Sequence, residues 1–351
     1  MSAAERPIRR AGIALGIRDA LLRYGAMLAA TFVIFGLILL LSGKDPIQSY
    51  RDIFLSTLGS TYGLSEVFVT MTPLVLTALA VALPSRLGLI NVGGEGQLYM
   101  GALLATWAAL RLESLPGWLL LPVMMVLGML GGGLWAFLPG YLRARGIVNE
   151  TITTLLLNMV APSLVAFFIF GFWHSPMDTN KTPNFAPGAR LPTLFDTRVD
   201  LSLVIGVLLL ASFWFVMKYT RWGLEMRSIG GNPQASRRNG IPVRRYIVVV
   251  MCLGGALAGL AGMAQVSGYY GVLLANFSRG IGYMGFLISW LAGGSPLGIL
   301  LTSFVVAIIL TGGNLLQLTR DVPYSVIHIL LAMTLFVVLA RPQFQRKRKT
   351  A

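Results

Sequence analysis

The sequence predicts an all-α polytopic membrane protein. Of its 351 residues, 56% are hydrophobic and only 12% are charged, and the mean hydropathy is +0.74. Soluble domains carry about 25% charged residues, so the shortage of charge is the informative property. The apolar residues also gather in runs near the length of about 20 residues that a helix needs to cross a bilayer. A chain built this way belongs in a lipid bilayer.

Ten apolar segments can be drawn along the chain. They cover residues 24–41, 67–84, 90–110, 118–142, 150–173, 201–218, 246–266, 281–292, 297–316 and 325–340. The eighth segment is too short to cross a bilayer alone and is followed by Gly293 and Gly294, so we expect a broken or re-entrant helix there. We therefore predict about ten transmembrane helices in one domain that covers residues 24–340.

The positive charges orient these segments. Arginines and lysines concentrate before the first segment, after the fourth, between the sixth and seventh, and at the end of the chain. Basic residues are retained on the cytoplasmic side, and with ten crossings all four clusters share one side. The sequence thus predicts basic cytoplasmic tails at 1–23 and 341–351 and a cytoplasmic loop at 219–245. The first tail leads into a span and is not a removed signal peptide.

Two longer segments fall on the other side, residues 44–66 and 175–200. The second contains Pro176, Pro183, Pro187 and Pro192, so we expect an irregular external loop without a long helix. Both are long enough to reach a soluble partner.

Several functions are excluded by what the sequence lacks. The net charge of +15 falls in clusters beside apolar runs, without the folded basic face that nucleic-acid binding needs. The single Cys252 and the two histidines, His174 and His328, provide neither a disulfide nor a histidine-rich metal site. No phosphate-binding loop of the G-x-x-x-x-G-K-[ST] type is present, and no nucleophile, base and orienting group occur together. We expect no catalytic residues, no metal and no cofactor in this chain.

A short polar stretch at residues 222–241 separates apolar runs. Asn232 is a good N-cap, Pro233 suits the first helical position and Gly240 suits the position after a helix end. Arg237 and Arg238 fall in the last turn, where the helix dipole favours positive charge. The pattern predicts a two-turn helix that is presented to a partner; the alternative is a solvated loop with a turn.

Small residues recur at four-residue spacing in two segments. Gly254, Ala258 and Gly262 form one series, and Gly128 and Gly132 form another. This spacing lets helix backbones approach closely in lipid, so it predicts helix packing and not cofactor binding.

The stretch NVGGEGQ at residues 91–97 places polar groups within an apolar segment. Glu95 needs compensation there, because an unpaired ionised group in a bilayer costs several kcal/mol. In one interpretation the glycines open the helix, and Asn91, Glu95 and Gln97 face a polar cavity that binds solute; in the other, Glu95 is a structural group, paired or capping. No sequence repeat is obvious, but two apolar segments, residues 88–105 and 282–299, are interrupted by glycine, and paired interruptions point to a substrate site near the membrane midplane.

The fifth apolar segment carries one polar stripe. Glu150, Thr154 and Asn158 share a helical face at four-residue spacing, which we expect to face the protein interior or a water-filled path. For Glu150, capping of the helix start is the simpler account, whereas Asn158 lies two turns deeper. Trp290 is a further candidate, because an indole can stack on a flat ligand ring, although packing explains it equally well.

Three motifs together resemble a known family. They are GLINVGGEGQLYMGA from Gly88, GIVNETITTLLLN from Gly146 and GLEMRSIGGNPQASRRNGI from Gly223. They resemble the permease subunits of bacterial ATP-binding-cassette (ABC) importers for nucleosides, in the wider group that serves ribose, other simple sugars and branched-chain amino acids. The N-x-G-x-E-G-Q core is similar to the nucleoside branch. The G-x-N-P-x-A pattern followed by G-I is similar to the coupling loop of the group, from which Gln234 and Ser236 depart.

The resemblance implies partners and a location. Two permease chains, identical or related, would sit in the bilayer of the bacterial cytoplasmic (inner) membrane with two cytoplasmic ATPase subunits, which bind ATP and Mg²⁺, and an external solute-binding protein. Asn91, Glu95, Gln97, Asn158 and Trp290 become the candidates for the substrate pathway. The candidates for contact with the ATPase are Arg227, Gly230, Asn232, Pro233, Gln234, Ala235, Arg237, Arg238 and Gly240.

The sequence alone leaves the solute open among a nucleoside, a base and a simple sugar. It also leaves open two other classes of function. A secondary transporter driven by an ion gradient would use Glu95 for coupling, and a membrane scaffold would need none of the polar pathway residues.

Overall fold

The computed structural model describes residues 33–41, 43–176, 178–194, 197–320, 329 and 332. The predicted tails at 1–23 and 341–351, the apolar segment 325–340 and His328 lie outside the described residues. The chain divides into two compact units, Thr61–Ile308 and Met1–Ser60 with Ile309–Ala351, and each is described by itself. The described residues contain helices and three isolated β-bridges, without strands.

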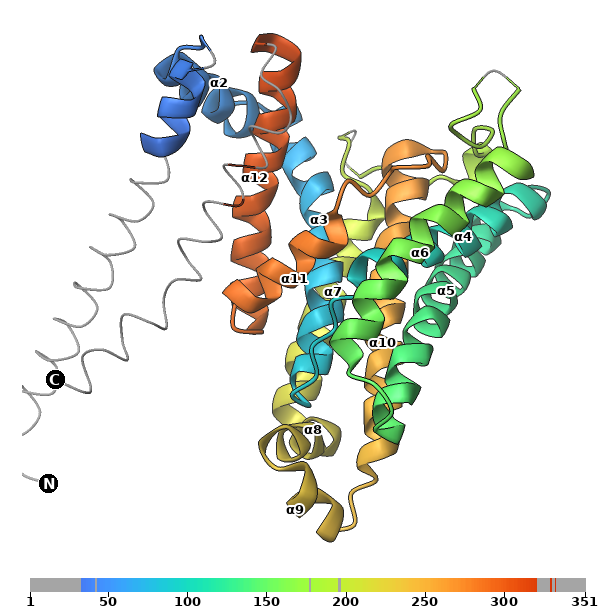
Figure 1. Ribbon diagram of the computed structural model, residues 1–351. Coiled ribbons are helices and arrows are strands. Elements are labelled where there is room, and N and C mark those ends of the chain that lie inside the picture. The colour runs from blue at the N-terminus through green and yellow to red at the C-terminus, as the bar shows by residue number, and fades with distance from the viewer. Residues whose placement is uncertain are drawn as a thin grey trace, which may run out of the picture. The chain divides into compact units, whose positions relative to one another are not determined.

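The larger unit is a bundle of helices (Figure 1). It contains α3 (Thr61–Ser85), α4 (Gly94–Arg111), α5 (Gly117–Arg145), α6 (Glu150–Gly171), the short η1 (Pro187–Ala189), α7 (Leu201–Tyr219), α8 (Arg221–Gly231), α9 (Pro233–Arg238), α10 (Val243–Ala264) with its π-helical continuation η2 (Gln265–Tyr270), α11 (Ile281–Leu291) and the first part of α12 (Pro296–Arg320). Helices α8 and α9 lie at one end of the bundle, and the loop after α6 lies at the other end (Figure 1).

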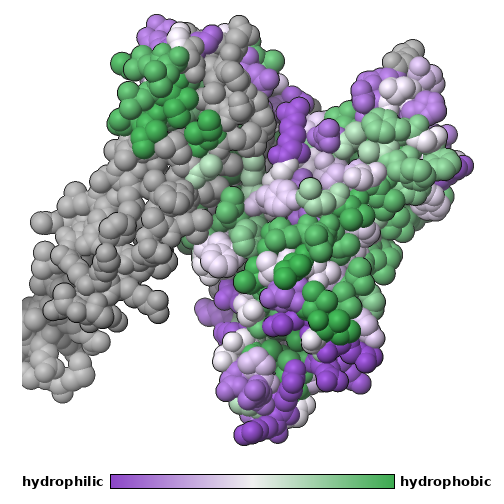
Figure 2. Space-filling model, viewed as in Figure 1, coloured by the Kyte–Doolittle hydropathy of each residue, from purple (hydrophilic) through white to green (hydrophobic). Residues whose placement is uncertain are grey.

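Six of these helices are long and apolar enough to cross a membrane. They are Thr61–Ser85, Gly117–Arg145, Glu150–Gly171, Leu201–Tyr219, Val243–Tyr270 and Pro296–Thr319, and Ile281–Leu291 is a shorter apolar helix. On one face of this unit, hydrophobic residues cover the middle and hydrophilic residues gather at the α8–α9 end (Figure 2). The total of about ten crossings stays a prediction, because half of the first apolar segment and most of the last lie outside the described residues, and α4 and α11 are not among the six.

The centre of the bundle depends on glycine. A Cβ atom added to Gly132 would overlap the backbone of Gly255, one added to Gly259 would overlap the backbone of Gly128, and one added to Gly262 would overlap the backbone of Leu98. These contacts join α5, α10 and α4 at backbone-to-backbone distance. The predicted packing role of the small residues is therefore confirmed.

The segment 175–200 is irregular, as its prolines predict. Its only helix among the described residues is the three-residue η1. It is tied to η2 at the end of α10, where the Ser267 hydroxyl donates to the Ala189 carbonyl at 2.6 Å and the Leu191 amide donates to the Ser267 carbonyl at 3.3 Å. This loop therefore covers the end of the bundle opposite α9.

The smaller unit contains a helix that the sequence analysis placed in a loop. Helix α2 (Pro46–Leu58) begins at Asp45, whose carboxylate accepts from the amides of Ile47 and Gln48 at 2.8 and 3.2 Å. Asp45 followed by proline is a helix-start signal, but α2 is too polar to register as an apolar segment. The treatment of 44–66 as a plain loop was therefore wrong.

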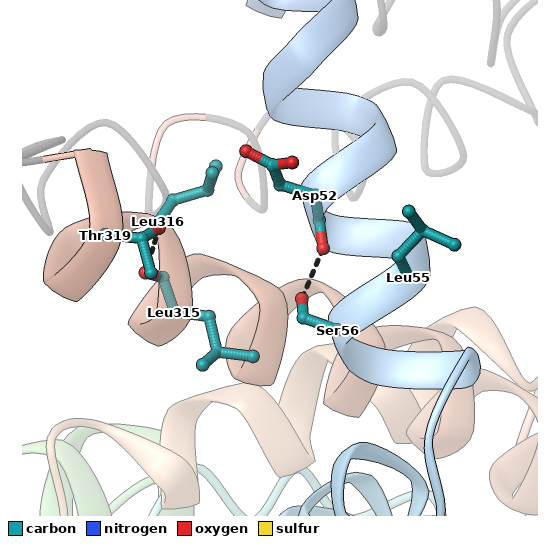
Figure 3. Close-up of a pocket in the computed structure, with 6 residues that line it drawn as sticks. All are labelled: Asp52, Leu55, Ser56, Leu315, Leu316 and Thr319. Atoms are coloured by element: carbon teal, nitrogen blue, oxygen red, sulfur yellow. Dashed lines mark hydrogen bonds between the residues drawn. The ribbon is translucent and has the colours of Figure 1, made fainter.

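A cavity of about 680 Å³ lies between α2 and the last part of α12 in this unit (Figure 3). Its lining combines Asp52, Leu55 and Ser56 with Leu315, Leu316 and Thr319. The Ser56 and Thr319 hydroxyls donate to carbonyls of their own helices. Both hydroxyls of the lining are thus engaged in contacts within their own helices.

Candidate functional site

The site begins at the segment that connects α3 to α4. Residues 86–93, which we call the approach segment, are not helical, so their backbone groups lack the hydrogen bonds of a helix ladder. Such backbone is tolerated at membrane depth only where protein groups or a water-filled cavity satisfy it. Turn hydrogen bonds to the end of α3 satisfy the amides of residues 86–89. Polar side chains singled out in the sequence hold the rest of the segment, at the Ile90 and Gly93 amides and the Val92 carbonyl.

Asn91 and Gln97 pair with each other through both halves of their amides. Asn91 Nδ2 donates to Gln97 Oε1 at 3.1 Å, and Gln97 Nε2 donates to Asn91 Oδ1 at 3.0 Å. Asn91 also accepts from the Gly93 amide at 3.0 Å and donates to the Ala80 carbonyl of α3 at 3.2 Å. Both side chains are buried. The pair closes the approach segment onto the first turn of α4.

Asn158 fastens α6 to the same place. Its Oδ1 accepts from the Gly96 amide at 2.8 Å, and its Nδ2 donates to the Val92 carbonyl at 2.9 Å. Asn158 is the ninth residue of α6, so at 1.5 Å per residue it lies about 12 Å beyond the helix start. Glu150, Thr154 and Asn158 are all buried, so the predicted stripe faces the protein interior.

Glu95 lies where the two glycine-interrupted segments meet. Its Oε2 accepts from the Gly282 amide in the first turn of α11 at 2.8 Å, and its side chain is 5% exposed. Glu95 is also in the first turn of α4, so the positive ends of two helix dipoles face one carboxylate. Among the described residues it forms no ion pair. A side chain at Gly282 would overlap the Glu95 backbone, so the contact requires glycine.

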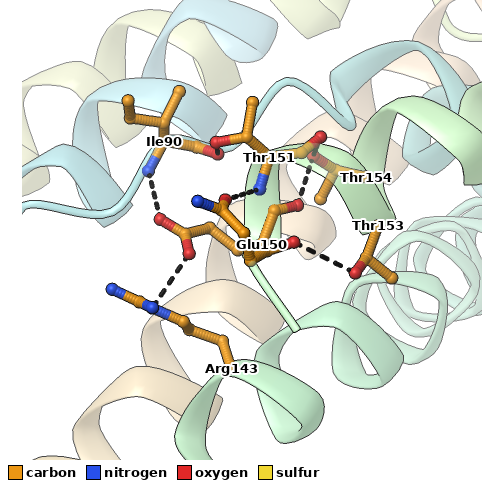
Figure 4. Close-up of polar contacts among 7 residues, drawn as sticks. Ile90, Arg143, Glu150, Thr151, Thr153 and Thr154 are labelled. Atoms are coloured by element: carbon orange, nitrogen blue, oxygen red, sulfur yellow. Dashed lines mark hydrogen bonds and ion pairs between the residues drawn. The ribbon is translucent and has the colours of Figure 1, made fainter. Parts of the chain in front are cut away.

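Glu150 does not cap its own helix. The N-cap of α6 is Asn149, whose side chain accepts from the Thr151 amide at 2.8 Å. Glu150 instead pairs with Arg143 near the end of α5 at 2.9 Å and accepts from the Ile90 amide at 3.2 Å (Figure 4). The interpretation of Glu150 as a cap was wrong, because the residue before it performs that role and leaves its carboxylate free to hold the approach segment against α5.

Trp290 is not brought to this cluster. It lies eight residues beyond Gly282 on α11, its side chain is 53% exposed, and its ring is 5.7 Å from that of Phe286. The structure instead brings in Trp135 of α5, which the sequence analysis did not select. The buried Trp135 Nε1 has no hydrogen-bond partner in the described part of the chain, and a Cβ added to Gly96 would lie 2.9 Å from it and 3.0 Å from Asn158 Oδ1. No local signal separates Trp135 from other membrane tryptophans.

The α9 end of the bundle carries the predicted short helix. Asn232 caps α9 by accepting from the Gln234 and Ala235 amides at 3.0 Å, Pro233 is the first helical residue, and Gly240 adopts a φ of +80° beyond the end. The prediction of a capped two-turn helix is confirmed. Among the coupling candidates, Arg237 and Arg238 are exposed in its last turn.

Arg86 connects this end to the approach segment. A Cβ on Gly230 of α8 would overlap the Arg86 carbonyl oxygen, so the two backbones touch. The Arg86 guanidinium donates to the Gly294 carbonyl at 2.6 Å and lies 5.5 Å from the centre of the Phe213 ring of α7. Burial lowers the pKa of this guanidinium, and the nearby Arg227 lowers it further. One residue thus contacts α7, α8 and the turn before α12.

Glu225 holds α8 to α10. It accepts from the Tyr246 hydroxyl of α10 and from Arg221 Nε at 2.9 Å. The hydrogen bond from Tyr246, followed by that from Arg221, keeps the pKa of the Glu225 carboxyl below its ordinary value. The carboxylate therefore stays ionised at neutral pH, and its hydrogen bond from Tyr246 attaches α8 to α10.

Apolar helices, a buried polar cluster and an exposed capped helix define a multi-pass membrane permease. Comparison with known proteins identifies the family: residues 63–339 match the family described as the branched-chain amino acid transport system / permease component, and the chain belongs to it. It is therefore the membrane-spanning permease subunit of an ABC transporter, in the cytoplasmic membrane. The family predicted from the three motifs is confirmed.

Three similar proteins are permeases whose names give glucose, nucleosides or guanosine as the solute. The sequence is 34% identical to a glucose ABC transporter permease protein of Haloferax volcanii, with 91% of this chain and 87% of that protein covered. It is 32% identical to a nucleoside ABC transporter permease protein of Lactococcus lactis subsp. cremoris, with 88% of each covered. It is 30% identical to a guanosine ABC transporter permease protein of Bacillus subtilis, with 86% and 88% covered.

The fold is also similar to a solved structure. The chain resembles PsaBC from Streptococcus pneumoniae in complex with Fab, with a TM-score of 0.51 at 13% identity, over 86% of this chain and 100% of that one. At this identity the likeness concerns the fold alone. The relatives are transport permeases and not enzymes. Membership of the family also argues against the two alternative hypotheses, a secondary transporter and a membrane scaffold.

Replacing Asn158 by alanine tests the structural part of the site. The change leaves the Gly96 amide and the Val92 carbonyl without their partners, and each buried unpaired group costs about 1–3 kcal/mol. We expect a lower melting temperature of the purified chain and a matching loss of uptake. Ser163→Ala on the exposed side of the same helix is the control and should leave both unchanged. Equal stability of Asn158→Ala and Ser163→Ala would contradict the role of Asn158.

Proposed function

We propose that this chain forms the translocation path for a nucleoside or a related small polar solute that an external binding protein delivers. The observation that carries the proposal is the cluster of neutral amides, Asn91, Gln97 and Asn158, buried where the approach segment joins α4. Neutral amides bind an uncharged solute without the desolvation cost of a full charge. Glu95 accompanies them, and the unpartnered Trp135 Nε1 adds a donor.

The Asn91–Gln97 pair suits a nucleobase. A side-chain amide presents a donor and an acceptor side by side, and such a pair matches a base edge with two adjacent hydrogen-bonding groups. In the described conformation each amide satisfies the other. A base edge entering the cluster could replace Gln97 as the partner of Asn91, and the displaced Gln97 amide would then need a second group of the solute as its own partner.

Energy for transport would come from a separate ATPase that binds ATP and Mg²⁺. Exposed α9, with Arg237 and Arg238 in its last turn, would insert into that subunit. Contact of Gly230 with Arg86 then carries a displacement of the α8–α9 end into the approach segment. The remaining coupling candidates, Arg227, Asn232, Pro233, Gln234, Ala235 and Gly240, lie on or beside α8 and α9.

The proposal includes the predicted topology. About ten spans, at a length of about 20 residues each, would place the α9 end, both basic tails and the loop at 219–245 in the cytoplasm. The loop at 175–200 would then face the binding protein outside. A second permease chain, identical or related, would complete the path, and Trp290, exposed on α11, is available to the path or to that chain.

A simple sugar is the second candidate solute. The observation that favours it is the 34% identity to the glucose permease of Haloferax volcanii. Sugar hydroxyls both donate and accept, so they can also replace the Asn91–Gln97 hydrogen bonds. The two candidates differ in whether a flat ring with a hydrogen-bonding edge is required.

Replacing residues 233–240 by a glycine-serine linker of equal length tests the coupling role. The linker removes the fixed helix but keeps the spans, so binding-protein-dependent uptake should fall to background while the chain still assembles in the membrane. Asn232→Ser, which keeps an N-cap, is the matched control and should retain uptake. Undiminished uptake with the linker would contradict the coupling role of α9.

Competition for uptake tests the solute class. With labelled nucleoside as substrate, unlabelled nucleosides in excess should abolish uptake, free bases should compete weakly, and pentoses and glucose should have little effect. A chain that takes up labelled glucose, with no competition by nucleosides, would instead favour the sugar proposal. Both assays use the chain assembled with its ATPase and binding protein.

A further inference from the structure

A second pocket lies at the α9 end of the larger unit, away from the amide cluster. Its volume is about 440 Å³, and it is formed by the turn after α3, the end of α5, α8 with α9, and the start of α10. Leu87, Leu89, Ile229, Val243 and Ile247 supply its apolar lining and are all buried. Three of its lining residues, Gly230, Pro233 and Arg237, are also coupling candidates, so the pocket adjoins the surface proposed to meet the ATPase.

Four arginines also line this pocket: Arg143, Arg145, Arg237 and Arg244. Glu150 neutralises Arg143, and in the described part of the chain none of the other three is in an ion pair. Arg145 lies 5.1 Å from the centre of the exposed Tyr141 ring. The pocket therefore holds an excess of positive charge above an apolar floor.

The position of Arg244 makes that charge more unfavourable without a bound anion. It lies in the first turn of α10, where the helix dipole repels a cation. That turn contains no acidic residue, and Pro242 at the N-cap provides no side-chain hydrogen bond. An anion in the pocket would relieve the repulsion between the arginines and would also face the positive end of α10.

The mixture of arginines and apolar side chains indicates an amphiphile. A free phosphate would use the arginines alone, whereas a phospholipid can place its phosphate on the arginines and its apolar part against the apolar lining. The pocket opens where the ends of α5 and α10 meet the polar end of the bundle, and both helices are apolar enough to span a membrane. Tyr141 beside Arg145 is the residue type that favours the membrane–water boundary.

We propose that this pocket binds the headgroup of an anionic phospholipid, with Arg145 and Arg244 on its phosphate and the acyl chains along the spans. Guanidinium groups bind phosphate oxygens in a bidentate way, which suits two arginines that line one pocket, one near the end of α5 and one at the start of α10. Because Arg237 of α9 lines the same pocket, a bound lipid contacts the helix proposed for coupling. The inference rests on the proposed function only in placing the α9 end at the cytoplasmic membrane surface.

The test uses the full chain purified in detergent, without ATPase, and titrates it with phosphatidylglycerol or phosphatidylcholine. Native mass spectrometry counts bound lipid, and the melting temperature is followed in parallel. We expect phosphatidylglycerol to bind and stabilise the wild type, and Arg145→Gln/Arg244→Gln to weaken that binding at least tenfold. The matched control, Arg238→Gln/Arg245→Gln, removes two neighbouring exposed arginines that do not line the pocket and should keep the affinity within about twofold.

Three results would overturn the proposal. They are equal binding of phosphatidylcholine, an equal loss of affinity in the control variant, and full displacement of phosphatidylglycerol by millimolar inorganic phosphate, which would assign the pocket to a free anion. Arg145→Lys/Arg244→Lys, which keeps the charge, should recover part of the affinity and distinguishes lost binding from lost folding. Because no ATPase is present, a failure of the coupling proposal would leave this measurement unaffected.

Discussion

The structure depends on how the interrupted backbone between α3 and α4 is satisfied. A chain that leaves the helical conformation inside a bilayer loses hydrogen bonds that water cannot replace there. Asn91 and Gln97 close the segment locally, and Asn158 reaches across from α6 to the Gly96 amide and the Val92 carbonyl. The same groups are the neutral donors and acceptors that a polar solute needs, so the structural requirement and the proposed pathway coincide.

Two contacts extend this arrangement toward the α9 end. Glu150 holds the Ile90 amide and is paired with Arg143, which fixes the approach segment against α5. At the start of the same segment, Arg86 touches Gly230 of α8 and donates to the Gly294 carbonyl. In the proposed mechanism, a displacement of α8 and α9 reaches residues 86–93 through the contact of Gly230 with Arg86. In the proposed mechanism this is how ATP hydrolysis on a partner changes the amide cluster.

Local sequence signals predicted much of this and missed what depends on distant contacts. Asn232 and Gly240 mark the start and end of α9, and both signals can be read from the sequence. The spacing of Glu150, Thr154 and Asn158 likewise places them on one face of α6. By contrast, the contact between Glu95 and Gly282 joins positions 187 residues apart, and no local pattern specifies it. Glu150 was misread because Asn149 and Glu150 are both suited to a helix start, and only the fold shows that Ile90 and Arg143 are within reach.

Hydrogen exchange of residues 86–97 tests the central claim that the α9 end acts on the amide cluster through the approach segment. The measurement compares the chain assembled with its ATPase subunits, with and without a non-hydrolysable ATP analogue. Faster or slower exchange at the Ile90, Gly93 and Gly96 amides on addition of the analogue is the predicted result, since their partners are Glu150, Asn91 and Asn158. Unchanged exchange at these amides, together with altered exchange in α9, would contradict the account.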